Sequence, residues 1–213
     1  MRVELNDVGH AFERGRFLFR HVTMQLPPGA MIALVGPSGS GKSTLLSIVA
    51  GWQVPTEGQV VRTDVARIAW VFQNPFGVPA RTVLDHVSLP AVARGASRCE
   101  ADRHAHGLLE RFGLADQGRQ SFATLSGGEA QRLMLARAVA SEPALILVDE
   151  PTAQLDATSA ATVIEVLDGL AARGASVIIA THDTRVRNAC PGVLDLGSRA
   201  PDLDARLVDT PAP

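Results

Sequence analysis

The sequence predicts an α/β fold with a mostly parallel sheet, an N-terminal antiparallel β subdomain and an inserted helical subdomain. Short apolar runs at Met31–Val35, 145–148 and Ser176–Ala180 are typical of strands that are buried on both faces. Helical patterns at Lys42–Ala50, 129–140 and 160–170 alternate with these runs. Strands that alternate with helices favour a parallel sheet covered on both faces.

The segments around this core differ in pattern. The first thirty residues alternate between apolar and polar side chains and close with a Pro-Pro-Gly turn, which predicts strands, and residues 66–72 read as a further strand. Residues 75–124 are rich in helix formers and predict a helical insertion. We therefore expect one domain over residues 1–213, with its core at 1–74 and 125–197, the helical subdomain at 75–124 and a short tail at 198–213 to which we assign no function.

The composition limits the classes of partner. A net charge of −2 and a pI near 6.3 give no basic footprint, so we expect no nucleic-acid partner. No apolar run approaches the ~18 residues that span a bilayer, and the first residues are polar where a signal peptide is apolar. We expect a cytoplasmic protein whose membrane role is peripheral, with Cys99 and Cys190 as unpaired thiols.

Residues 36–44 carry the first chemical motif. They read GPSGSGKST and match the phosphate-loop pattern G-x-x-x-x-G-K-S/T between a predicted strand and a predicted helix, which indicates a P-loop NTPase core. Lys42, the only lysine of the chain, is expected to reach the β- and γ-phosphates of ATP, and Ser43 to bind Mg²⁺. The predicted nucleotide-binding residues here are Gly36, Pro37, Ser38, Gly39, Ser40, Gly41, Lys42, Ser43 and Thr44.

A second motif places two carboxylates after a buried strand. The run LILV at 145–148 is followed by Asp149, which is positioned to hold Mg²⁺, and by Glu150, which is positioned to polarise an attacking water as general base. A carboxylate pair at a strand end can also be a solvated turn. The phosphate loop in the same chain favours the catalytic interpretation.

Residues 125–132, LSGGEAQR, separate this chain from other phosphate-loop proteins. Here the sequence resembles the ATP-binding cassette (ABC) family, whose signature motif is LSGGQ, with Glu129 standing where glutamine is most frequent. The resemblance implies that two cassettes pack head to tail, so that Ser126, Gly127 and Gly128 of one copy bind the γ-phosphate held by the phosphate loop of the other. It also implies an integral membrane permease as partner.

The resemblance assigns further roles in chain order. Gln73 matches the glutamine that binds Mg²⁺ or water and senses the transporter, Asp156 matches the loop that crosses the dimer interface, and His182 matches the histidine that contacts the γ-phosphate. The chain has no tyrosine to stack on adenine, and Phe12 stands at the matching position. Phe12 could equally belong to the core of the β subdomain, together with Phe17 and Phe19.

Two segments bear on the type of cassette. PSGSGKSTLL and residues 82–90, TVLDHVSLP, resemble the lipoprotein-release and macrolide-export branch, which favours export. Between Gly58 and Arg67 the chain departs from that branch, because about ten to fifteen residues that are usual there are missing. An importer ATPase, a soluble ABC ATPase and a nucleotide sensor without turnover are the alternatives, and Glu150 with His182 argues against the sensor.

Overall fold

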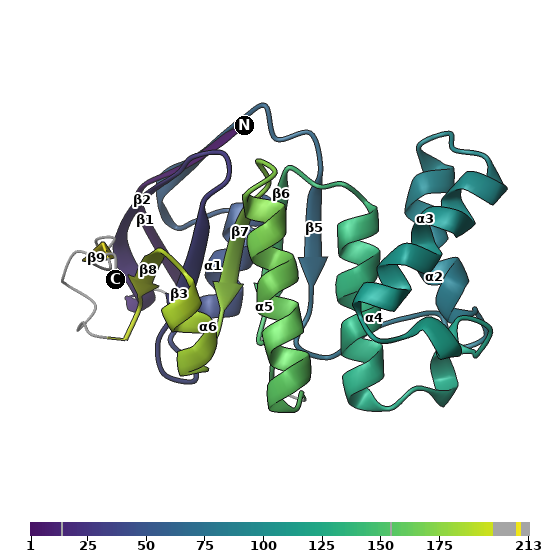
Figure 1. The fold of residues 1–213 in the computed structure, drawn as a ribbon. Helices are drawn as coiled ribbons and strands as arrows, with labels where there is room; N and C mark the ends of the chain where they lie inside the picture. Colours follow the sequence, from purple (N-terminus) through teal and green to yellow (C-terminus); the bar gives the residue numbers. More distant parts are fainter. Residues whose placement is uncertain (14, 154, 198–207, 210–213) are drawn as a thin grey trace.

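The computed structural model describes residues 1–13, 15–153, 155–197 and 208–209. In these ranges two sheets, six helices and two short 3₁₀ turns follow one another along the chain (Figure 1). The strands are β1 (Arg2–Glu13), β2 (Arg16–Leu26), β3 (Met31–Val35), β4 (Glu57–Thr63), β5 (Ile68–Val71), β6 (Leu145–Asp149), β7 (Ser176–Ala180), β8 (Gly192–Asp195) and β9 (Val208–Asp209). The helices are α1 (Lys42–Ala50), α2 (Val83–Ala93), α3 (Arg98–Arg111), α4 (Gly127–Ala140), α5 (Ala157–Ala171) and α6 (Thr184–Ala189), with 3₁₀ turns at Ala115–Gln117 and Phe122–Thr124.

The central sheet has the strand order β5-β6-β7-β3-β8-β9 and is parallel up to β8. Only its last pair, β8 with β9, is antiparallel. Because successive side chains of a strand point to opposite faces, Met31 and Ala33 of β3 join one core cluster while Ile32 and Leu34 join the other. The α/β fold with a mostly parallel sheet is therefore confirmed.

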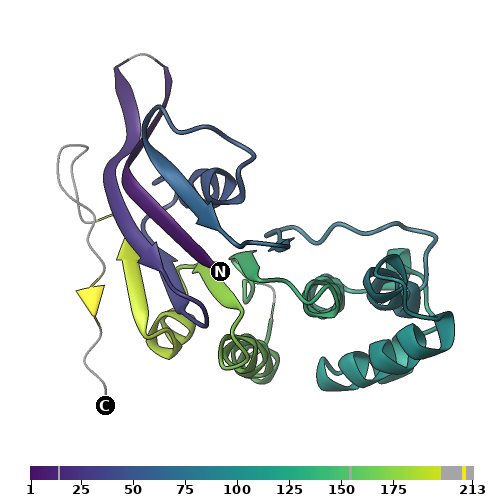
Figure 2. The same ribbon diagram turned by 90° about the horizontal axis from the view of Figure 1, so that it is seen from above.

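The antiparallel sheet, with the order β2-β1-β4, lies over α1 (Figure 2). Its apolar side chains share a core cluster with α1 and with one face of the central sheet. The other face of the central sheet packs against α4 and α5. The strand β4 escapes the sequence prediction, because its residues EGQVVRT are mostly polar and half-exposed.

The helices α2 and α3 form an arm on the far side of α4 from the antiparallel sheet (Figure 2). Capping residues fix where each begins: Thr82 accepts a hydrogen bond from the Asp85 amide, and Ser97 with Glu100 forms a capping box at α3. Residues of α2 and α3 nevertheless belong to the same core cluster as α4 and β6.

Two smaller predictions have mixed outcomes. Cys99 and Cys190 are free thiols, as predicted, and burial raises the pKa of Cys190 to about 12. The tail, to which no strand is assigned from the sequence, contains β9, whose pairing with Gly192 and Val193 extends the sheet. The rest of the tail lies outside the described residues.

Candidate nucleotide-binding site

The phosphate loop joins the end of β3 to the start of α1. Gly39 and Gly41 have φ values of 82° and 96°, in the left-handed region that glycine adopts without strain. A Cβ at Gly41 would also lie 2.7 Å from side-chain carbons of Leu18 and Phe19. No side chain caps the start of α1, so its first amide groups are available to an anion.

Two polar side chains of this loop, Lys42 and Ser40, have different surroundings. The Lys42 Nζ atom donates to the carbonyl oxygens of Gly36, at 2.8 Å, and Pro37, at 3.3 Å, and so lies across the loop. The Ser40 hydroxyl is buried and has no hydrogen-bond partner among the described residues. Buried polar groups are rarely left unpaired, so an unpaired hydroxyl at this position is unusual.

Asp149 ends β6 directly opposite the start of α1. It is buried, and the Ser43 hydroxyl donates to its Oδ2 atom at 2.5 Å. Burial raises the pKa of Asp149 and the neighbouring Glu150 charge adds to this, whereas the Ser43 hydrogen bond and Lys42 oppose it. Mg²⁺ takes carboxylate and hydroxyl oxygens as ligands, so these two residues fit that ion.

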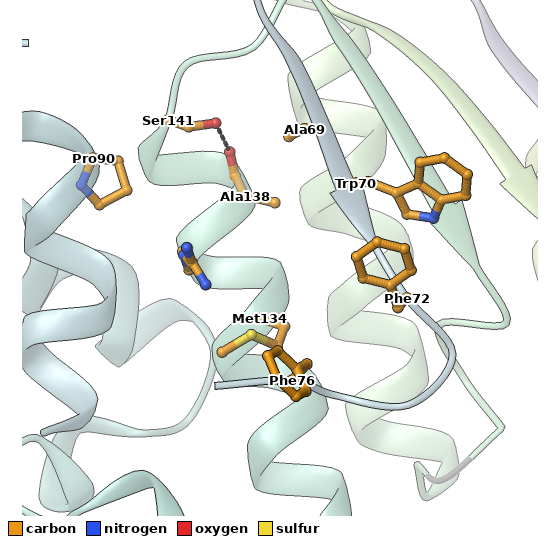
Figure 3. Close-up of a pocket in the computed structure, with 9 residues that line it drawn as sticks. Ala69, Trp70, Phe72, Phe76, Pro90, Met134, Ala138 and Ser141 are labelled. Atoms are coloured by element: carbon orange, nitrogen blue, oxygen red, sulfur yellow. Dashed lines mark hydrogen bonds between the residues drawn. The ribbon is translucent and has the colours of Figure 1, made fainter. Parts of the chain in front are cut away.

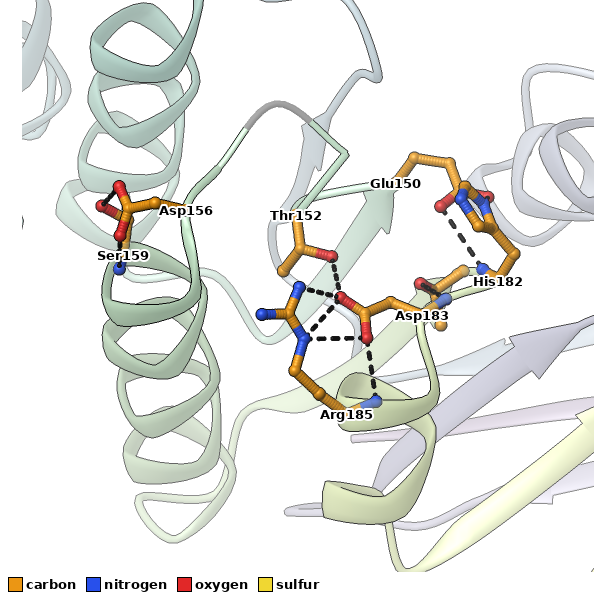
Figure 4. Close-up of polar contacts among 8 residues, drawn as sticks. Glu150, Thr152, Asp156, Ser159, His182, Asp183 and Arg185 are labelled. Carbon is orange, nitrogen blue, oxygen red and sulfur yellow. Dashed lines mark hydrogen bonds and ion pairs between the residues drawn. The ribbon is translucent and has the colours of Figure 1, made fainter.

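Glu150 and His182 face each other at the ends of β6 and β7 (Figure 4). The His182 Nδ1 atom lies 2.9 Å from Glu150 Oε1, and the His182 amide donates to Oε2 at 3.4 Å. Glu150 has a φ of 48°, an uncommon value for a residue with a side chain, and its amide donates to the Ala180 carbonyl at 2.8 Å. The backbone therefore turns this carboxylate towards His182 and away from β6.

A neighbouring network, which we did not predict from the sequence, joins the same two loops. The Thr152 hydroxyl donates to Asp183 Oδ2 at 2.9 Å, and the Arg185 guanidinium pairs with the same carboxylate at 2.7 Å (Figure 4). Hydrogen bonds from Arg185 lower the pKa of Asp183 to about 2. The only sequence signal is that Thr152 and Asp183 each follow a motif residue by one or two positions.

Lys42, Ser43, Asp149, Glu150 and His182 line one cleft of about 540 Å³, because parallel strands bring the ends of β3, β5, β6 and β7 to the same edge of the sheet. The predicted residue Ser40 and the network of Thr152, Asp183 and Arg185 do not line it. Phe12 belongs to the lining of this cleft and is 70% exposed, so it is not part of the core. Phe19, by contrast, is buried in the core of the β subdomain. Gln73, two residues after β5, also lines the cleft. The full lining is Phe12, Leu18, Gly36, Pro37, Ser38, Gly39, Gly41, Lys42, Ser43, Thr44, Gln73, Asp149, Glu150 and His182.

The predicted residues Ser126, Gly127, Gly128 and Asp156 do not line this cleft. They stand at the starts of α4 and α5, two neighbouring helices (Figure 1). Ser126 and Glu129 form a capping box in which the Glu129 carboxylate accepts from the Ser126 amide at 2.8 Å. This pairing explains why glutamate serves at position 129, and hydrogen bonds from Ser126 lower the pKa of Glu129.

A polar chain links the two helix starts. Asp156 caps α5 by accepting from the Ser159 amide at 2.9 Å and from its hydroxyl at 2.8 Å. The Arg132 guanidinium of α4 donates to the Ser159 hydroxyl at 3.2 Å. The loop before α5 is therefore tied to the helix that carries Ser126.

Known proteins are similar to this chain in sequence and in fold. The family described as ABC transporter matches residues 19–153. An uncharacterized ABC transporter ATP-binding protein of Mycobacterium tuberculosis is 37% identical, with 91% of this chain and 86% of that protein aligned. The cell division ATP-binding protein FtsE of Escherichia coli is 34% identical over 85% of this chain and 88% of its own length.

Two further comparisons extend the match. The pyoverdine export ATP-binding/permease protein PvdT of Pseudomonas fluorescens is 35% identical over 84% of this chain, which spans 30% of PvdT. A dimeric post-hydrolysis structure of the ATP-binding cassette MJ0796 with ADP and Pi superimposes with a TM-score of 0.85, at 30% identity and with 97% and 98% of the two chains covered. Within the described residues, no helix is both long and apolar enough to cross a membrane. The chain belongs to the ABC transporter family, as an ATP-binding and ATP-hydrolysing subunit.

Proposed function

We propose that two copies of this chain enclose two Mg·ATP between them, head to tail, and drive a separate membrane permease. The observation that carries the proposal is that the two helix starts predicted to bind phosphate, those of α1 and α4, are separated within one chain. The cleft contains the phosphate loop, while Ser126 to Gly128 lie outside it at the start of α4. A second copy can bring its own α4 to the open side of the cleft, and MJ0796 forms a dimer.

Within one copy, the cleft residues divide the nucleotide between them. Phe12 offers a ring face to adenine, the residues from Gly36 to Thr44 surround the phosphates, and Lys42 neutralises their charge. Ser43 and Asp149 would hold Mg²⁺, with Gln73 as a third oxygen ligand from the opposite wall. The ion, when bound, neutralises negative charge on the phosphate oxygens.

Hydrolysis needs a base, and Glu150 is the carboxylate placed for it. Its backbone is held by Ala180, its side chain is held by His182, and it faces the cleft that holds Lys42. We propose that Glu150 accepts the proton of the attacking water, and that His182 orients both the Glu150 carboxylate and that water. Ser126 of the partner subunit, with the amides that follow it, would stabilise the charge on the transferred phosphoryl group.

Asp156 has a different proposed role, at the dimer interface. It lies at the start of α5 and connects to α4 through Ser159 and Arg132. A partner that moves Asp156 therefore also moves the helix that carries Ser126. This link supports coupling between the two sites of the dimer.

The permease is proposed to dock in a groove of about 340 Å³ between β5 and α4, with Pro90 of α2 also in its lining (Figure 3). Trp70 and Phe72 form one wall, and Phe76 and Met134 lie opposite them. Phe76 is 81% exposed and Trp52, stacked on Trp70, is 67% exposed. Contiguous exposed aromatic surface marks an interaction site, and this one begins directly beside Gln73 of the nucleotide cleft.

PvdT, which is named as both ATP-binding protein and permease, supports a permease as the partner of this chain. Its name also supports export, as does the resemblance of the phosphate loop to the export branch. The chain is then expected to sit on the cytoplasmic face of the membrane. Co-purification of a membrane-spanning protein from detergent extracts should be lost in Phe76→Ser while ATP binding persists; retention in that variant would place the permease elsewhere.

A mixing experiment tests the composite site. Lys42→Ala disables the loop half of each site, and Ser126→Arg disables the half supplied in trans. Each variant should be inactive alone, yet a mixed dimer contains one intact site, so an equimolar mixture should regain about a quarter of the wild-type sites. Phosphate release measures the recovery. A mixture as inactive as its components would contradict the head-to-tail site.

A further inference from the structure

The exposed ring of Phe12 has a buried neighbour on the same strand, His10. The two rings meet edge to face, with centroids 4.9 Å apart and planes at 85°. His10 is 6% exposed, whereas Phe12 is 70% exposed. We infer that His10 positions the Phe12 ring for contact with adenine, an inference that rests on the stacking role proposed for Phe12.

His10 is itself fixed at both ring nitrogens. The Gln53 amide nitrogen lies 2.7 Å from His10 Nε2, and the Thr56 hydroxyl lies 3.4 Å from Nδ1. Thr56 also accepts from the amide of Ala11 at 3.0 Å, so it is anchored to β1. The imidazole therefore cannot turn without breaking contacts on two sides.

These contacts also show what His10 does not do. The Gln53 side-chain amide and the Thr56 hydroxyl each engage one ring nitrogen of His10. Both nitrogens are engaged and the ring is buried, which leaves no polar atom for the nucleotide. His10 is thus a positioning residue that acts through Phe12.

The contacts of His10 with Gln53, which we call the brace, connect the Phe12 ring to the phosphate-loop helix α1. Gln53 follows the end of α1, and its backbone amide donates to the Ser47 carbonyl of that helix at 3.3 Å. The path runs from α1 through Gln53 and His10 to the Phe12 ring. A Phe ring that is already oriented loses less freedom when adenine binds, and preorganisation of this kind increases affinity.

A double-mutant cycle tests the inference by calorimetry with ADP and with inorganic tripolyphosphate, which has no base. His10→Ala should weaken ADP binding about three- to tenfold, the range of an edge-to-face aromatic pair, and leave tripolyphosphate unchanged. Phe12→Leu should also weaken ADP binding, and His10→Ala should have no further effect in that background. Gln53→Leu keeps the His10 ring but removes its contact with the Gln53 amide, so this variant should weaken ADP binding as His10→Ala does.

The matched control is His21→Asn. His21 is another histidine of this sheet, paired with Asp7 at 2.8 Å, and it does not line the cleft. That variant should bind ADP like the wild type. Asparagine tolerates the left-handed backbone of position 21, where φ is 55°.

Three results would overturn the inference. ADP affinity that is unchanged in both His10→Ala and Gln53→Leu while Phe12→Leu weakens it would remove the brace but keep the stacking role. An equal loss for tripolyphosphate, or a loss that persists in the Phe12→Leu background, would mean that His10 acts on the phosphate loop or on the fold. Unchanged ADP affinity in Phe12→Leu would instead refute the base contact on which the inference rests.

Discussion

Replacement of Glu150 by glutamine is the sharpest test of the catalytic assignment. Glutamine has the same shape, and its amide oxygen can still accept from the His182 amide, which now lies 3.4 Å from Oε2. The φ of 48° at this position is unchanged by the substitution, so the fold should persist. What is lost is the carboxylate that can take a proton from water.

Two effects of this substitution are expected, one on turnover and one on nucleotide binding. Removal of a general base costs about 10²- to 10⁴-fold in turnover, or roughly 3 to 5.5 kcal/mol of transition-state stabilisation. Binding should move the other way, because the Glu150 charge is one of the causes that raise the pKa of Asp149. Loss of this negative charge from the cleft also weakens its repulsion of the phosphates, so Glu150→Gln should bind Mg·ATP at least as tightly as the wild type.

Phosphate release measures turnover, and light scattering with Mg·ATP measures dimer formation. The expected result is a dimer that forms with ATP and persists because hydrolysis is slow. Glu142→Gln is the matched control, since Glu142 also has a φ of 48° but pairs with Arg94 away from the cleft. Turnover in Glu150→Gln within a few-fold of the control would refute the role of Glu150 as base.

The remaining predictions concern binding, pH and the fold. Lys42→Ala should weaken ATP binding by about 10- to 150-fold, since it removes a charged hydrogen bond worth roughly 1.5–3 kcal/mol; a nucleotide titration with near-normal affinity would contradict this. Arg185 lowers the pKa of Asp183 to about 2 from its ordinary 3.8, so this carboxylate stabilises the fold above about pH 4 and the contribution is lost as pH falls through about 2. The unfolding free energies of wild type and Asp183→Asn, from urea titrations, should therefore differ near neutral pH and converge towards about pH 2; a difference that does not change with pH would refute this. Gly58→Ala, whose Cβ would lie 2.2 Å from a backbone oxygen of β1, should destabilise the fold by about 2–4 kcal/mol, and by clearly more than Gly95→Ala, which has a similar φ but open space; equal losses would show that the contact is relieved without cost.

Patterns with strong local physics were predictable. A five-residue apolar run such as Met31–Val35 is typical of a strand buried in a sheet. The glycines after it indicate a turn with left-handed backbone, which other residues adopt only with strain. The strand β4 and the short elements α6 and β8 escaped prediction, because their stability comes from neighbours that are distant in sequence. For the same reason, the exposed position of Phe12 could not be separated from a core position until β1 was placed.

The sequence by itself predicted phosphate binding, because that chemistry requires particular residues at fixed spacing, and its resemblance to the ABC signature at residues 125–132 implied an ATP-hydrolysing cassette. Tertiary structure alone decided how these residues meet: that Glu150 is held by His182, that Thr152 and Asp183 join their loops, and that His10 stands beside Phe12. It also showed that the start of α4 lies outside the cleft. The contacts between separate loops depend on strand order and register, which bring together Glu150 and His182, 32 positions apart, and Ser43 and Asp149, 106 positions apart.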